Sequence, residues 1–91
     1  MSRAIVLTER DNVATLLDEL PAGSEIESAG RRIEARQAIP AGHKLALRSI
    51  AAGEPVIKYG EPIGRASRDI AEGEHVHTHN LHSDRGRGDR V

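Results

Sequence analysis

A short pattern with glycine at its centre recurs four times, and it constrains the fold of this chain more than any other feature. An apolar residue, any two residues, a glycine, any two residues and a second apolar residue occupy positions 20–26, 39–45, 50–56 and 70–76. This pattern is typical of a strand end, a tight turn with glycine in a left-handed backbone conformation, and a new strand. The copies are irregularly spaced, which excludes a solenoid. We therefore predict an all-β domain of short strands and glycine-rich turns.

The segments between these corners support strands. Polar and apolar residues alternate at 32–36 and, less strongly, at 44–48, as in half-buried strands. Residues 55–59 are predicted to form a strand that leads into a turn at 60–64, with a return strand from 65. Residues 11–20 fit either a helix capped by Asp11 or a strand. A strand is favoured there, because the segment leads into the first glycine corner.

Composition limits the size of the fold and the classes of partner. Ninety-one residues suit a single small domain, and its core must be aliphatic because the chain has no Phe or Trp and one Tyr. A net charge of −1 argues against a domain built for nucleic acid or acidic lipid. No apolar run approaches the roughly 20 residues of a membrane span. The absence of cysteine excludes a disulfide framework, so we expect a cytoplasmic protein.

Three histidines stand at alternate positions, His75, His77 and His79. On a single strand they would line one face, and histidine is the commonest metal ligand. Neighbours on such a strand lie roughly 6.5–7 Å apart, so two of them can converge on one ion. His77 with His79 is the predicted pair, with further ligands from elsewhere. Contact of the row with substrate or a partner subunit is the favoured alternative, and a solvated strand end is the simplest one.

Three motifs in order, at residues 42–47, 56–64 and 69–80, resemble the amino-terminal domain of altronate dehydratase. That domain is a SAF domain with the β-clip fold. The likeness implies a domain over residues 1–82 and leaves residues 83–91 as a flexible tail. Galactarate dehydratase and the small subunit of sulfolactate sulfo-lyase carry related modules. Galactarate dehydratase lacks the histidine row, which favours the altronate-like branch.

The resemblance implies a hydro-lyase that dehydrates a sugar acid to a 2-keto-3-deoxy acid, with a divalent metal, Fe or Mn, in the complete enzyme. In fused enzymes the module precedes a much larger catalytic body. This chain starts at Met1 and stops soon after the module, so we expect a separately encoded small subunit that is inactive without a large dehydratase subunit. A truncated chain is the alternative. A homo-oligomer is compatible with the sequence.

The resemblance also implies roles for single residues. His43 would donate a proton to the leaving hydroxyl, and Lys44 would bind the carboxylate of the sugar acid. The implied catalytic residues are His43 and His77, and the implied substrate-binding residues are Lys44, Tyr59, His75 and Asn80. For Tyr59, packing in the core is the favoured interpretation. Asn80 fits either contact with a substrate hydroxyl or a cap on the strand end.

Two other classes of function stay open. The chain fits a non-catalytic SAF module that binds carbohydrate or protein, or the small subunit of a sulfolactate sulfo-lyase. It also fits a free-standing metal-binding protein, which would retain metal after purification.

Overall fold

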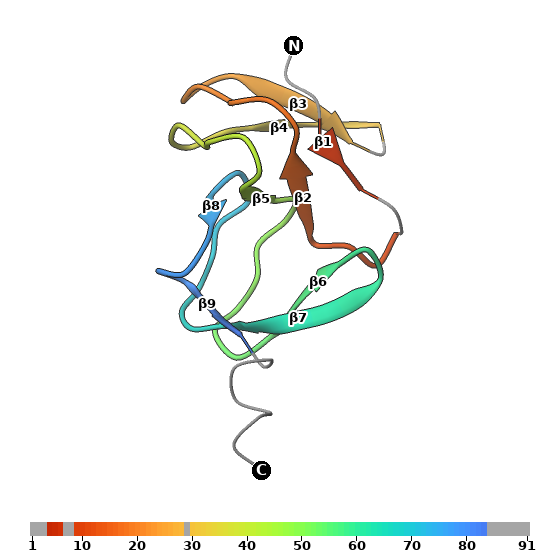
Figure 1. The fold of residues 1–91 in the computed structure, drawn as a ribbon, viewed down its shortest axis with the longest axis vertical. Coiled ribbons are helices and arrows are strands. Elements are labelled where there is room, and N and C mark those ends of the chain that lie inside the picture. Colours follow the sequence, from red (N-terminus) through yellow and green to blue (C-terminus); the bar gives the residue numbers. More distant parts are fainter. Residues whose placement is uncertain (1–3, 7–8, 29, 84–91) are drawn as a thin grey trace.

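The computed structural model describes residues 4–6, 9–28 and 30–83. These residues form nine short strands and no helix, so the all-β prediction is confirmed and none of them belongs to a helix that could span a membrane (Figure 1). The strands are β1 Ala4–Ile5, β2 Val13–Leu16, β3 Glu25–Ser28, β4 Arg31–Glu34, β5 Lys44–Ala46, β6 Pro55–Lys58, β7 Glu61–Ala66, β8 His75–Val76 and β9 Leu81–Ser83.

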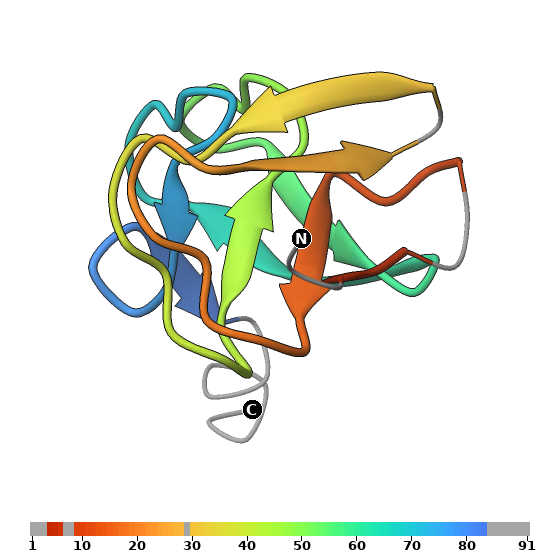
Figure 2. The same cartoon turned by 90° about the horizontal axis from the view of Figure 1, so that it is seen from above.

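The strands form three antiparallel sheets. A central sheet has the order β1-β2-β5-β8, β3 and β4 form a hairpin, and a third sheet has the order β6-β7-β9. Figure 1 shows the β3–β4 hairpin at one end of the molecule and the β6-β7-β9 sheet at the other, with β2, β5 and β8 between them. In Figure 2 the hairpin crosses over the central sheet. The central sheet therefore has a layer on each side.

The four glycine corners associate in two pairs. Leu20 and Ile39 exchange two backbone hydrogen bonds of 2.9 and 2.8 Å, and Ile50 and Ile70 exchange two of 2.8 Å. The corner glycines all have φ between 84° and 87°, as their left-handed role in the turns requires. The first pair of corners is thus repeated by the second pair later in the chain. The sequence pattern reflects this internal duplication.

Each half of the duplication has its own aliphatic core. The first cluster is Ala14, Leu16, Leu20, Ile26, Ile33, Ala35, Ile39, Leu45 and Leu47. The second is Val13, Ala46, Ile50, Val56, Ala66, Ile70 and Val76. Both clusters receive side chains from β2 and β5, because alternate residues of a strand face opposite sides of a sheet. The core is aliphatic, as the composition predicts.

Of two local predictions, the strand in segment 11–20 is confirmed and the turn at 60–64 is wrong. The ambiguous segment 11–20 contains the strand Val13–Leu16, as favoured. The predicted turn at 60–64 is wrong, because the chain reverses over Tyr59 and Gly60 alone and β7 begins at Glu61. Both turn residues have positive φ, 55° and 79°. A two-residue loop of this kind matches the twist of the strands that it joins.

The histidine segment also differs from its prediction. Its strand ends at Val76, and residues 77–80 form a bend and a turn, so no single strand carries all three histidines. The reason is the side chain of Asn80, which is bonded to the backbone of the segment. Ser83, assigned to the tail, belongs to β9. The rest of the predicted flexible tail, residues 84–91, lies outside the described residues.

Candidate functional site

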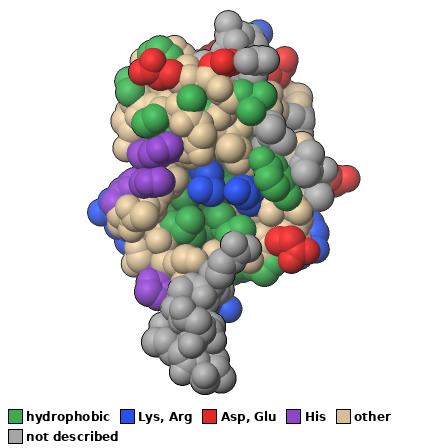
Figure 3. Space-filling view, viewed as in Figure 1, with side chains coloured by type: hydrophobic (Ala, Val, Ile, Leu, Met, Phe, Trp, Pro, Cys, Tyr) green, Lys and Arg blue, Asp and Glu red, His purple; other side chains and the backbone are tan. Residues whose placement is uncertain are grey.

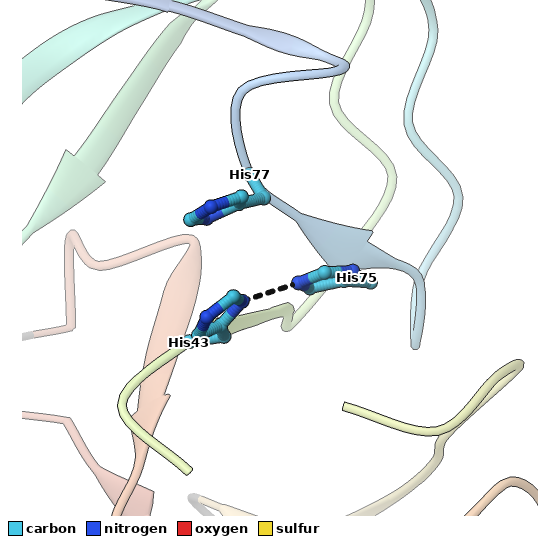
Figure 4. Close-up of side chains that lie close together, drawn as sticks. All are labelled: His43, His75 and His77. Atoms are coloured by element: carbon cyan, nitrogen blue, oxygen red, sulfur yellow. Dashed lines mark hydrogen bonds between the residues drawn. The ribbon is translucent and has the colours of Figure 1, made fainter. Parts of the chain in front are cut away.

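Three histidines from two distant segments converge at one edge of the central sheet (Figure 4). His43 follows the glycine of the second corner and directly precedes β5, while His75 lies on β8. The two strands are antiparallel neighbours, with Leu45 opposite His75. Cross-strand pairing therefore brings His43 to the segment that carries His75 and His77.

The imidazole rings of this cluster, His43, His75 and His77, lie roughly parallel to one another. The Nδ1 atom of His43 is 2.9 Å from Nε2 of His75, so one of these nitrogens carries a proton and the other accepts it. The rings of His43 and His77 stack with their centroids 4.1 Å apart. The centroid of His79 lies 5.4 Å from that of His75, with the rings tilted by 45°. His79 thus borders the imidazole cluster.

Asn80 holds the turn that carries these rings. Its side chain is completely buried. Its Oδ1 accepts a hydrogen bond from the backbone N–H of His77, and its Nδ2 donates one to the carbonyl of His75, both at 2.9 Å. A buried amide used in this way positions the backbone that carries the histidines. Of the two roles open for Asn80, the structure realises the cap at the strand end.

The electrostatics around His75 and His77 favour neutral rings. Partial burial lowers the pKa of His75, and the neighbouring charges of His43, His79, His77 and Lys44 lower it further. The pKa of His77 is also lowered, first by burial and then by His43, Lys44 and His79. Desolvation and like charge both penalise the protonated form. Neutral imidazole is the form that binds a metal or accepts a proton.

Lys44 stands beside the cluster at the edge of a groove of about 590 Å³, which is also lined by Lys58 and Glu61. Burial and the charge of Lys58 lower the pKa of Lys44. Tyr59, expected in the core, is only partly buried on the β6–β7 turn. Its ring lies under Lys58, with the ammonium nitrogen 5.1 Å from the ring centroid. Its position in the turn keeps it out of both aliphatic clusters.

The imidazole cluster offers three nitrogen donors that could hold a metal ion. One ring nitrogen from each of His43, His75 and His77 lies within 4.8 Å of the others. Two ligands of a tetrahedral ion with bonds of 2.0–2.1 Å lie about 3.3 Å apart, so the rings would have to turn out of their stacked arrangement to direct three nitrogens at one ion. Imidazole donors suit iron and zinc better than manganese. The structure groups His77 with His43 and His75 where the sequence paired it with His79.

Comparison with known proteins identifies the family of this chain. Residues 2–84 match the altronate/galactarate dehydratase SAF domain. The chain is 42% identical over 80 residues to an altronate dehydratase of Bacillus subtilis, covering 88% of this chain and 16% of that protein. It is 51% identical over 70 residues to an altronate dehydratase of Escherichia coli, covering 77% and 14%. Over 54 residues it is 50% identical to the alpha subunit of a (2R)-sulfolactate sulfo-lyase of Paracoccus pantotrophus, covering 59% and 81%.

The chain therefore spans less than a fifth of either altronate dehydratase, and most of the sulfo-lyase subunit. The likeness covers all described strands, including both segments that supply the imidazole cluster. With an aliphatic all-β fold and a family match over nearly its whole length, the chain belongs to the altronate/galactarate dehydratase SAF domain family.

Proposed function

We propose that this chain is the SAF component of a cytoplasmic, altronate dehydratase-like hydro-lyase and acts with a large catalytic polypeptide. The observation that carries the proposal is the convergence of His43, His75 and His77 beside Lys44. The large partner follows from size, because the altronate dehydratases are several times longer than this chain. A domain of 91 residues offers one wall of such a site, so the chain alone is expected to be inactive.

The proposed reaction removes the proton next to the carboxylate and expels hydroxide from the following carbon. The resulting enol becomes a 2-keto-3-deoxy acid. A divalent metal held in the complete enzyme by His77 and further ligands would supply positive charge for the carboxylate and the developing enolate. Among the two metals that the resemblance implies, imidazole ligation favours iron.

The residues of this chain can bind the acid and move a proton. Lys44 offers a point charge for the carboxylate. His43 uses Nδ1 in its bond to His75, which leaves Nε2 for the leaving hydroxyl. When Nε2 gives up its proton, Nδ1 can take one from Nε2 of His75 across the 2.9 Å hydrogen bond, and His75 recovers a proton from solvent. His77 stacks on His43 and fixes its ring.

The test is reconstitution with a large dehydratase subunit from the same genome, with formation of the 2-keto-3-deoxy acid from altronate as the readout. Turnover is expected to require this chain and to fall in the His77→Ala variant. His82→Ala is the matched control, because His82 is exposed on β9 and is not part of the imidazole cluster. Equal turnover with and without the chain would remove it from the mechanism.

A second candidate has one specific observation in its favour. The alpha subunit of the Paracoccus pantotrophus sulfo-lyase is matched over 81% of its length, so that protein is also a small chain with this domain. The same reconstituted complex can be offered (2R)-sulfolactate. Release of sulfite from sulfolactate, with no loss of water from altronate, would favour this second function.

A further inference from the structure

Both lysines of the chain line the groove beside the imidazole cluster. Thirteen residues of the sequence are Lys or Arg, and only Lys44 and Lys58 are lysines. Lys44 comes from β5 and Lys58 from β6, and both line the same groove, whose apolar floor includes Ile63 and Leu81. Figure 3 shows blue basic side chains above a green apolar floor, with purple histidines along the adjoining edge.

The two ammonium groups share the groove, and none of the described residues gives either of them a direct counter-ion. Both side chains line the same groove, so each contributes positive charge to it. Glu61 faces Lys58 across the β6–β7 pair and lines the groove, but within the described residues the structure shows no ion pair between either lysine and a carboxylate. Bringing an anion between two such cations relieves their repulsion and adds attraction to both.

A buried hydroxyl without a hydrogen bond lies next to Lys44. Thr15 is directly opposite Lys44 in the β2–β5 pair, so their side chains share one face of the sheet. Among the described residues, Thr15 Oγ1 is the one buried side-chain polar atom without a hydrogen-bond partner. Buried polar atoms are rarely left unsatisfied unless a bound group or water completes them. This hydroxyl shares a face of the sheet with Lys44 but is not among the groups that line the groove.

We propose that the groove is a carboxylate-binding site in which Lys44 and Lys58 together hold the acid group of a small hydroxy acid. The identification of that acid as altronate rests on the proposed function. The assignment of Lys58 and of the groove between β5, the β6–β7 hairpin and β9 goes beyond it. The carbon chain of the acid would extend from the lysine pair toward the imidazole cluster.

The test uses the 91-residue chain labelled with ¹³C at the lysine side chains, which gives one set of signals for each of its two lysines. Sodium altronate is the probe, and altritol, which has the hydroxyls without the acid group, is the neutral control at the same ionic strength. Altronate is expected to shift both sets of signals in a saturable way, whereas altritol leaves them unchanged.

Variants then assign the binding to Lys58. The Lys58→Met substitution is expected to weaken altronate binding about tenfold, the scale of losing one hydrogen bond to a charged group. Lys58→Arg, which keeps the charge, should retain most of the affinity. Arg68→Met removes one positive charge from an exposed position outside the groove and should leave the affinity unchanged.

Three results would overturn the proposal: no saturable shift with altronate, equal shifts with altritol, or unchanged affinity in Lys58→Met. If altronate does not bind but Lys58→Met weakens association with the large subunit, the groove is a protein-docking surface instead. Binding and turnover are separate readouts. Altronate binding without turnover in the reconstituted complex would therefore refute the proposed function and leave the carboxylate site standing.

Discussion

Replacing Asn80 by alanine tests how the imidazole cluster is held. The amide of Asn80 is completely buried and bonds to the N–H of His77 and the carbonyl of His75, each at 2.9 Å. Alanine leaves these two backbone groups without their partner, and each buried group left unsatisfied costs about 1–3 kcal/mol. We expect the free energy of unfolding to fall by about 3 kcal/mol. For a domain of this size, that corresponds to a melting temperature lower by about 12 °C or more.

Asn12 provides a matched control, because it is also buried and also clamps a backbone segment. Its Oδ1 accepts from the N–H of Ile57 at 2.7 Å and its Nδ2 donates to the carbonyl of Pro55 at 3.0 Å. Asn12→Ala should cost a similar free energy of unfolding, measured by urea denaturation with far-ultraviolet circular dichroism. Only Asn80→Ala should raise the pKa of His75 toward 6.5, measured by nitrogen-detected NMR titration. A cost below about 1 kcal/mol for Asn80→Ala, or the same histidine shift in both variants, would refute this reasoning.

Three further predictions follow from the geometry. His75 and His77 have pKa values below 6.5 in the folded state, so the unfolded chain binds more protons than the folded chain. The free energy of unfolding should therefore fall as the pH drops below 6.5 toward the folded-state pKa values. Urea denaturation at a series of pH values in this window measures the fall. Gly73→Ala should lower the free energy of unfolding by about 3 kcal/mol or more in the same assay, because its new methyl group would overlap a backbone carbonyl oxygen of β4 at a positive φ. Gly53→Ala has open space around the new methyl group and should lower the free energy of unfolding by only about 1–2 kcal/mol. Cobalt titration followed by visible absorption should show binding that weakens by about 10-fold or more in His77→Ala and is unchanged in His82→Ala.

The parts of the fold that depend on local chemistry were predictable from the sequence. The repeated pattern with glycine at its centre specifies a turn between strands in which the glycine has a left-handed backbone conformation. The glycines of all four copies have that conformation. The helix-like spacing of apolar residues after Asp11 did not mislead the prediction, because the first corner needed a strand before it. The β6–β7 turn was predicted in the wrong place because Gly64 was taken for a turn residue. Gly64 lies within β7, where a side chain would collide with the backbone of His82.

The imidazole cluster was only half predictable. His43 and His75 are 32 residues apart, and their contact depends on which corners become neighbours. The sequence gives no local sign that β5 pairs with β8. The turn after Val76 did have a signal, since Asn80 stands three residues after His77 and asparagine favours turns by bonding to nearby backbone. Alternation of the histidines suggested an extended strand more strongly, and that expectation failed where the asparagine amide replaced ladder hydrogen bonds.

The position of the imidazole cluster on the core explains why so small a domain can present it in a fixed arrangement. His75 and His77 flank Val76, and His43 lies two residues before Leu45; both apolar side chains are completely buried, one in each aliphatic cluster. The backbone of the fourth corner is bonded to β5 on both sides of this point, through Gly73 N–H to Ala46 and Ala46 N–H to Glu74. Moving the backbone that carries any of the three rings therefore requires a buried side chain or a backbone hydrogen bond to move with it. The rings themselves are held by stacking and by the His43–His75 hydrogen bond, so a larger polypeptide of the kind proposed above would meet histidines whose backbone is already ordered.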